Sequence, residues 1–397
     1  MDRRPKAPPQ RPEPMTFYLV KGASDACGRG CDSWIQAEGK IEGATTARFK
    51  AFLDRLKDRN LPIYFNSPGG NLDQAILMGN MLHARLSLAR IGRTLVRECG
   101  FEAQDSEACI KVKQSGRELH GDVFTRGALC ASACPYFFAG APRHEIAPDA
   151  VVGVHSPKIV FNFHGAPQPD AAVIAAADQR GHERADRMVA GYLAKMGIDG
   201  GLLRVADSVR FEDIHILTRE EIARFGLDRR ELVETAWRFE SNGLNMMHKV
   251  AAVRAPGETS FRLLQWRVAC FDTNRFALDF QRPAPASVNY TTVAIAASDA
   301  KPVYFSYPPA KATGVEQWAL RMPRPALQSL LDRPEVELTE TALFGDGHRA
   351  PQTTRLSNEG WAGALDALLA TCPPAKAPAP AAQAASAGAL TPANEHR

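Results

Sequence analysis

Apolar and polar positions alternate in two ways between Ser33 and Val233. Short apolar runs, typical of buried strands, are followed by segments in which apolar residues recur every three or four positions, as on one face of a helix. The turn Asn-Ser-Pro-Gly-Gly at residues 66–70 ends the second run, and Asn71 can cap the helix after it. Strand, glycine turn and helix in this order predict βαβ units, in which helices cover a parallel sheet. The predicted strands are 34–38 and 61–65, and the predicted helical faces are Phe49, Phe52, Leu53 and Leu56, and Leu72, Ile76 and Leu82.

The rest of the chain predicts two more helices and then a different fold. A helix-length run covers residues 171–196, and Thr218 with Glu221 forms a capping box for a short helix that Gly226 ends. From about Trp237 the segments alternate residue by residue, as strands with one buried face do. They predict a separate β-rich domain that closes with one helix. The segments are the strands 262–269, 275–280, 290–295 and 302–305 and the helix 360–371.

These patterns divide the chain into four segments. Residues 1–23 are rich in Pro and Arg and residues 374–397 in Ala and Pro, so both are expected to be disordered. Between them we expect an α/β domain at residues 24–235 and the β-rich domain at residues 236–373. The chemistry is expected in the α/β domain.

Composition narrows the classes of function. Hydrophobic residues make up 45% and charged residues 23% of the 397 residues, which is ordinary for a globular protein. The net charge is only +4, and no basic stripe is interleaved with aromatic residues, so nucleic acid is not an expected partner. No run approaches the roughly 18 apolar residues that span a bilayer, so no transmembrane segment is expected.

The eight cysteines can form three local pairs and one distant pair, which suits an oxidising compartment. They could instead be buried as small apolar side chains, or two C-x-x-x-C pairs could bind zinc. That spacing is not the one of a zinc knuckle, and no metal is expected. The first residues contain no export signal. We therefore expect a periplasmic or other extracytoplasmic protein whose leader is missing from this sequence, with the cytoplasm as the alternative. The pairs are Cys27 with Cys31, Cys99 with Cys109, Cys130 with Cys134, and Cys270 with Cys372.

Ser132 is the candidate nucleophile. A serine hydrolase needs an exposed serine, a base that reaches its hydroxyl, backbone N–H groups for the oxyanion, and usually a group that orients the base. Ser132 lies in the run Ala-Leu-Cys-Ala-Ser-Ala-Cys-Pro, whose small residues leave room for a substrate. A strand before it and a helix after it would place the hydroxyl at their junction and turn the N–H of Ala133 toward the site. Taken alone, the pattern is more typical of a serine that merely begins a buried helix.

The chain also offers a base and further oxyanion donors. His155 ends the apolar run Val-Val-Gly-Val, where it can reach the end of a neighbouring strand. Gly69 and Gly70 can adopt backbone conformations that leave an amide pointing into a site. Neither signal is strong alone, since such a histidine is more often structural, and it is their combination with Ser132 that indicates a hydrolase.

The combined pattern resembles the proteolytic subunit of the Clp protease and its ClpP-like relatives over about residues 33–230. The Cys27 and Cys130 regions are similar to those of bacterial, often exported ClpP-like proteins. Residues 217–227 resemble the closing helix of the family. The resemblance rests on residues 66–70, 131–140, 143–149 and 152–157.

This resemblance implies an α/β fold, a ClpP/crotonase-type spiral of ββα units that forms a homo-oligomer. It implies Ser132 as nucleophile, His155 as base, and the N–H groups of Gly70 (or Gly69) and Ala133 as the oxyanion hole. The implied activity is cleavage of peptide bonds in a peptide or protein substrate, with no cofactor. The chain lacks a G-x-x-x-x-G-K-[ST] motif, so any unfoldase would be a separate chain.

The sequence departs from the family at three places. The residue that aligns with the family's orienting aspartate is Ile214, and Asp213 beside it is a weak candidate for that role, with Glu212 and Asp207 close by. An insertion at about residues 93–122 could form a lid or a hairpin beside the site. A disulfide between Cys130 and Cys134 would enclose Ser132 in a tight ring, whereas a reduced Cys134 could itself be a nucleophile.

Three functions are consistent with these features. A serine peptidase is favoured by Ser132, His155 and the glycine turn. A catalytically inactive ClpP-like protein that binds a peptide or a partner is the alternative, favoured by the unmatched aspartate and the cysteine ring. An acyl-CoA enzyme of the crotonase branch would need only the oxyanion hole.

Overall fold

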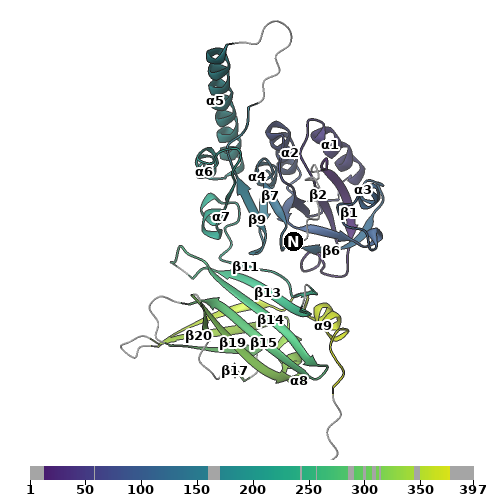
Figure 1. Cartoon of the computed structure of the whole chain (residues 1–397), viewed down its shortest axis with the longest axis vertical. Coiled ribbons are helices and arrows are strands. Elements are labelled where there is room, and N and C mark those ends of the chain that lie inside the picture. Colours follow the sequence, from purple (N-terminus) through teal and green to yellow (C-terminus); the bar gives the residue numbers. More distant parts are fainter. Residues whose placement is uncertain are drawn as a thin grey trace, which may run out of the picture.

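The computed structural model describes residues 13–57, 59–159, 170–241, 244–255, 257–284, 290–297, 301–305, 310–312, 314–343 and 349–375. The chain is a mixed α/β structure with several sheets (Figure 1). The buried residues of two hydrophobic clusters lie within residues 15–227, and those of another lie within residues 237–368. Within the ranges given above, none of the helices has the length and apolar character needed to cross a membrane.

The first sheet has seven strands. Their order is β5 (Arg93–Val96), β6 (Leu119–Phe124), β1 (Thr16–Lys21), β2 (Ser33–Glu38), β3 (Ile63–Asn66), β4 (Leu88–Ile91) and β8 (Arg143–Glu145). Strands β2, β3, β4 and β8 run parallel, with α1 (Thr45–Leu56) between β2 and β3 and α2 (Leu72–Ala84) between β3 and β4. Asn71 caps α2 as predicted, because its side chain accepts a hydrogen bond from the N–H of Gln74 at 2.9 Å. The predicted βαβ units are thus present.

A smaller sheet carries the segments around Ser132 and His155. Its strands lie in the order β10 (His215–Ile216), β9 (Val151–Val154) and β7 (Leu129–Ala131). Its helices are α4 (Cys134–Ala139), α5 (Ala171–Met196), α6 (Gly201–Asp207) and α7 (Arg219–Phe225). The C-terminal part of α5 is buried through Val189, Tyr192 and Leu193, and the rest of α5 extends away from the sheets (Figure 1). The capping box of α7, Thr218 with Glu221, is confirmed.

Residues 16–21 correct one expectation. They form β1 between β2 and β6, so the prediction of disorder for residues 1–23 is wrong for them. Both faces of this strand are buried, with Phe17 in one hydrophobic cluster and Tyr18 and Val20 in another. A strand buried on both faces shows no alternation in sequence, which is why the pattern did not reveal it. Residues 1–12 and 376–397 of the two ends lie outside the described residues.

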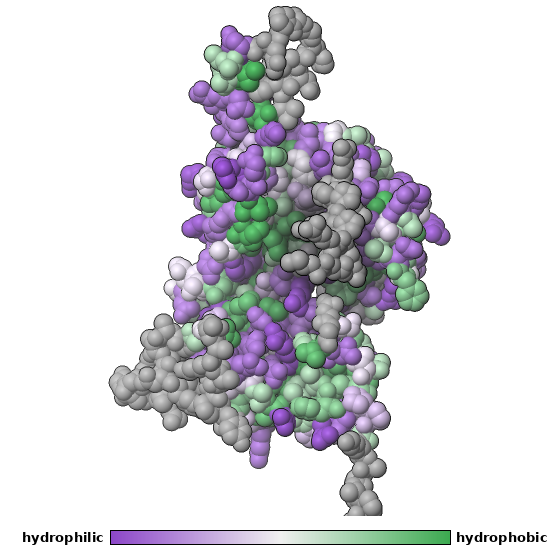
Figure 2. Space-filling view, in the orientation of Figure 1, coloured by the Kyte–Doolittle hydropathy of each residue, from purple (hydrophilic) through white to green (hydrophobic). Residues whose placement is uncertain are grey.

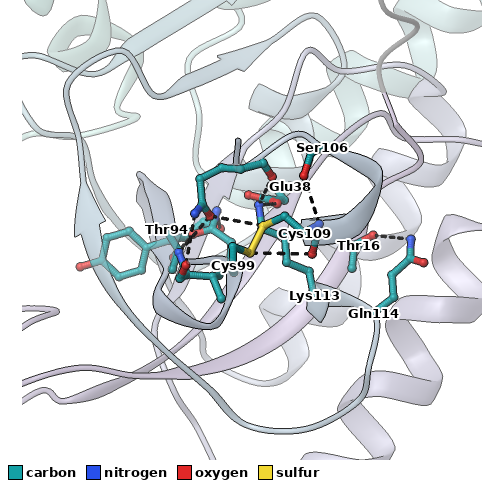
Figure 3. Close-up of polar contacts among 12 residues, drawn as sticks. Thr16, Glu38, Thr94, Cys99, Ser106, Cys109, Lys113 and Gln114 are labelled. Carbon is teal, nitrogen blue, oxygen red and sulfur yellow. Dashed lines mark hydrogen bonds and ion pairs between the residues drawn. A yellow bond between two sulfur atoms is a disulfide. The ribbon is translucent and has the colours of Figure 1, made fainter. Parts of the chain in front are cut away.

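The insertion is a strand–helix–strand unit attached to the first sheet. It runs from β5 through η1 (Arg97–Cys99) and α3 (Glu107–Lys113) to β6, which pairs antiparallel with β5. The Nζ of the buried Lys113 lies 2.5 Å from Oε1 of Glu38 on β2 and donates to the carbonyl of Gln104 at 2.7 Å (Figure 3). The disulfide Cys99–Cys109 lies beside this ion pair. None of residues 93–122 is among the described residues that line the cavity at Ser132.

Two antiparallel sheets contribute to the C-terminal hydrophobic cluster. The first has the order β11 (Leu232–Glu234), β13 (Met246–Val253), β14 (Arg262–Asp272), β15 (Arg275–Pro283), β19 (Val315–Pro323) and β18 (Ala310–Ala312), with β12 (Arg238–Glu240) beside β13. The second has the order β17 (Val303–Tyr304), β16 (Tyr290–Ala297), β20 (Glu335–Leu343) and β21 (Arg349–Ser357). The helices α8 (Arg324–Leu331) and α9 (Trp361–Leu369) pack on the same cluster.

All eight cysteines are in disulfides, in the pairs expected from the sequence. The pair Cys270–Cys372 joins β14 to the end of α9, as predicted. The zinc alternative is wrong because it required thiolates and no cysteine is free.

We predict that Lys113→Ala lowers the free energy of unfolding by about 3 kcal/mol, because it leaves Glu38 without its cation in a largely buried setting. Urea unfolding with the disulfides intact measures this. Lys111→Ala is the matched control on the same helix, since Lys111 pairs with an exposed Glu107 and contributes little. Equal unfolding midpoints for the two variants would contradict the prediction.

Candidate active site

The backbone at Ser132 is in an unusual conformation. Ser132 connects β7 to α4 with a φ of 59°, in the left-handed region that residues other than glycine rarely adopt. Its N–H donates to the carbonyl of Gly153 on β9 at 2.9 Å. Such conformations cost about 1–3 kcal/mol and occur often at functional sites. The strand-to-helix junction expected from the sequence is present. Its left-handed backbone makes Ser132 a candidate functional residue.

A disulfide encloses this junction. Cys130 at the end of β7 and Cys134 at the start of α4 are bonded to each other, with their Cα atoms 5.2 Å apart. Both cysteines are fully buried, whereas Ser132 between them is partly exposed. Cys134 therefore has no thiol, and the alternative in which it is the nucleophile is wrong.

The glycine turn lies directly against Ser132. Gly69 has a φ of 89°, and a Cβ placed on it would lie 2.6 Å from Cβ of Ser132 and 2.7 Å from the N of Ala133. Its N–H donates to Oγ of Ser67 at 3.1 Å. Among the described residues, no acceptor binds the N–H of Gly70 or of Ala133. Two uncommitted backbone donors therefore lie on the two segments that meet at Ser132.

The ring of His155 is oriented by a backbone carbonyl. His155 follows β9, and its Nδ1 lies 2.8 Å from the carbonyl oxygen of Ser156. A carbonyl only accepts hydrogen bonds, so Nδ1 carries the hydrogen and Nε2 of the neutral ring keeps its lone pair. The N–H of Ser156 donates to the carbonyl of Val209 at 2.9 Å, and the imidazole lies edge-on to Phe211 with ring centres 5.1 Å apart.

Asp213 has a different partner from the one expected. Its carboxylate accepts hydrogen bonds from Nε and Nη2 of Arg210 at 3.0 and 2.7 Å. In the described part of the chain no carboxylate contacts His155, and Ile214, at the aligned position, is exposed. The orienting contact that the sequence did not reveal is the Ser156 carbonyl, because a backbone acceptor has no signature in the sequence.

One cavity of about 730 Å³ brings the expected residues together. Ser132, His155, Gly69, Gly70 and Ala133 all line it. Figure 2 shows hydrophobic residues gathered below the protruding part of α5. The other residues that line the cavity come from the loop after β2, from residues 68–73 and 157–159, and from α4, α5, α6 and the loop after α6. They include Lys40, Asp73, Tyr136, Lys158, Asp186, Met188, Val189, Leu203 and Phe211.

No family model and no curated protein matches the sequence. Several solved structures are similar to parts of the fold. A variant of the 1510-N membrane-bound stomatin-specific protease has a TM-score of 0.29 and 15% identity, over 53% of this chain and 77% of its own. A variant of ClpP1 from Listeria monocytogenes has a TM-score of 0.28 and 12% identity, over 53% of this chain and 88% of its own. Invasion associated protein b from Bartonella henselae has a TM-score of 0.26 and 11% identity, over 35% of this chain and 91% of its own. Each of these TM-scores is below 0.5.

We predict that Gly69→Ala destabilises the protein by about 2 kcal/mol or more, because the added Cβ meets Ser132 and φ is positive there. Gly43→Ala is the control, since a Cβ at Gly43 has no neighbour within 4 Å among the described residues. Thermal unfolding of both variants measures the difference. A Gly69→Ala protein as stable as the Gly43→Ala protein would show that the turn does not pack against Ser132 in this way.

Proposed function

We propose that this chain is a serine peptidase in which Ser132 is the nucleophile and His155 the base. The observation that supports it most is the strained backbone of Ser132 in the cavity that also contains His155 and the glycine turn. In the proposed reaction Oγ of Ser132 attacks the peptide carbonyl carbon while its proton passes to Nε2 of His155. The proton then passes to the leaving amine as the C–N bond breaks. Water hydrolyses the acyl-enzyme by the same two steps.

The oxyanion would be bound by the N–H groups of Gly70 and Ala133. Both lack an acceptor among the described residues, whereas the N–H of Gly69 is already bound by Ser67. Backbone donors that are fixed before the reaction stabilise developing charge without reorganisation. The role of Gly69 in this mechanism is steric, because a residue without a Cβ allows the turn to approach Ser132.

The proposed site is a dyad oriented by the backbone. The Ser156 carbonyl holds the tautomer of His155 that leaves Nε2 free. A carbonyl stabilises the imidazolium less than a carboxylate does, so we expect slower turnover than in a complete triad. Asp213, bound to Arg210, is not required in this mechanism.

We also propose the wider assignments that the sequence suggested. These are a ClpP/crotonase-type spiral at residues 24–235, a β-rich domain at residues 236–373, and assembly into a homo-oligomer. The parallel units β2-α1-β3 and β3-α2-β4 support the first. Four disulfides support an extracytoplasmic location.

A second candidate function is an inactive ClpP-like protein that binds a peptide or a partner. It is favoured by two observations, namely the missing carboxylate at His155 and the covalent ring around Ser132. In this case the cavity would bind a peptide without cleaving it.

Labelling with a fluorophosphonate tests the proposed activity. We expect one adduct on the wild type by intact mass, its loss in Ser132→Ala and strong slowing in His155→Ala, because the probe reacts with an activated serine. Ser208→Ala, at an exposed serine, is the control that keeps the adduct. Absence of labelling in a folded protein with four disulfides would reject the peptidase and leave the binding protein.

The ring around Ser132 has its own test. We expect the double substitution Cys130→Ala and Cys134→Ala to slow labelling about tenfold or more, because the strained backbone loses its covalent support. The matched control is Cys27→Ala with Cys31→Ala, which removes a disulfide of the same spacing outside the site and leaves the rate unchanged. Faster labelling after loss of the Cys130–Cys134 bond would show instead that this disulfide closes the site.

A further inference from the structure

The cavity at Ser132 extends to a wall formed by α5 and α6. Ala185, Met188 and Val189 of α5 and Leu203 of α6 give this wall an apolar surface. Asp186 of α5 lies among them and lines the same cavity. The wall therefore combines apolar surface with a carboxylate.

Tyr136 of α4 is a buried polar residue that also lines this cavity. It follows Ser132 by four residues and is only 6% exposed. Its phenol makes no hydrogen bond to any residue in the described ranges. Burial first, and then the charges of Asp207 and Asp186, raise the pKa of this phenol above its usual value. Because Tyr136 lines the cavity and its phenol has no hydrogen-bond partner among the described residues, its hydroxyl is available to a polar group of a bound ligand.

Two acids near Tyr136, Asp186 and Asp207, have no lysine or arginine partner among the described residues. Neither Asp186 nor Asp207 forms an ion pair with a lysine or arginine in the described part of the chain, although many other acids of this protein do. Burial raises the pKa of Asp207, and the charge of Asp186 raises it further, while His182 opposes this. Asp207, exposed at the end of α6, is not among the described residues that line the cavity, whereas Asp186 lines it and lies on the wall formed by α5 and α6. Asp73 of α2 also lines the cavity, but it lies outside this wall.

We infer that this wall recognises the basic side chain of a lysine or arginine next to the scissile bond, which deepens the proposed peptidase function and rests on it. The aliphatic stem of such a side chain would pack against Met188, Val189 and Leu203. Its charged head would bind the carboxylate of Asp186 and the hydroxyl of Tyr136. The lysines of the cavity, Lys40 and Lys158, come from other elements, and Lys158 lies over the ring of Phe211 at 5.5 Å.

A pair of covalent probes tests this inference. Diphenyl phosphonates with a lysine or a norleucine side chain differ only in the ammonium group, and both form an adduct with an activated serine. We expect the lysine probe to inactivate the wild type about tenfold faster than the norleucine probe. Asp186→Asn should bring the two rates close together, mainly by slowing the lysine probe. Tyr136→Phe should reduce the ratio of the lysine-probe rate to the norleucine-probe rate only in part, because only the hydroxyl is lost.

Glu183→Gln is the matched control. Glu183 lies on the same helix, is exposed and accepts a hydrogen bond from Gln179 at 3.1 Å, so the ratio should equal that of the wild type. The fluorophosphonate separates the two ways of failing. If it labels Ser132 while norleucine reacts as fast as lysine, or while Asp186→Asn keeps the wild-type ratio, the inference is wrong and the peptidase stands. If it labels nothing, the peptidase and the inference fail together.

Discussion

Two backbone hydrogen bonds between Ser67 and β7 determine the geometry of the candidate site. The N–H of Ser67 donates to the carbonyl of Leu129 at 2.6 Å, and the N–H of Ala131 donates to the carbonyl of Ser67 at 3.0 Å. They join the end of β3 in the first sheet to β7 in the second. Gly69 follows Ser67 by two residues and Ser132 follows Ala131 directly, so this pairing sets the distance between the glycine turn and Ser132. The Oγ of Ser67 also donates to the carbonyl of Gly39 at 2.7 Å and accepts from Gly69, which fixes the turn itself.

The strain at Ser132 is tolerated because both of its flanks are fixed. Strand β7 is paired on one side with β9 and on the other with Ser67. Helix α4 is buried along its whole length, and the ring of Phe137 packs edge-on against Phe65 at 4.8 Å. A backbone held at both ends cannot relax locally without loss of core packing, which is how a cost of about 1–3 kcal/mol is kept at a single residue.

The sequence predicted those parts of the fold that have local signals. The Asn71 cap, the capping box at Thr218 and the bounds of α5 follow from residue types at fixed spacing. Strand β1 was missed because both of its faces are buried, which removes the alternation that reveals a strand. In the site, Ser132, His155 and the two glycines were found by their order along the chain, and the structure places them around one cavity. Tyr136 and Asp186 gave no signal, because a tyrosine in an apolar run and an aspartate on a polar helix are ordinary until folding brings them together.

The backbone contact at His155 changes which residues the proposed base depends on for its orientation. A carboxylate orients a histidine through one side chain, and its charge also stabilises the imidazolium. Here the acceptor is the carbonyl of Ser156, whose position depends on the hydrogen bond to Val209. The ring of Phe211 restricts the imidazole from the side. The orientation of the His155 ring is therefore set by the loop between α6 and β10, and an acid at residue 213 or 214 is not needed to hold the ring in place. What this arrangement lacks is charge, so the loop can fix the tautomer of the base but cannot replace the electrostatic contribution of a carboxylate.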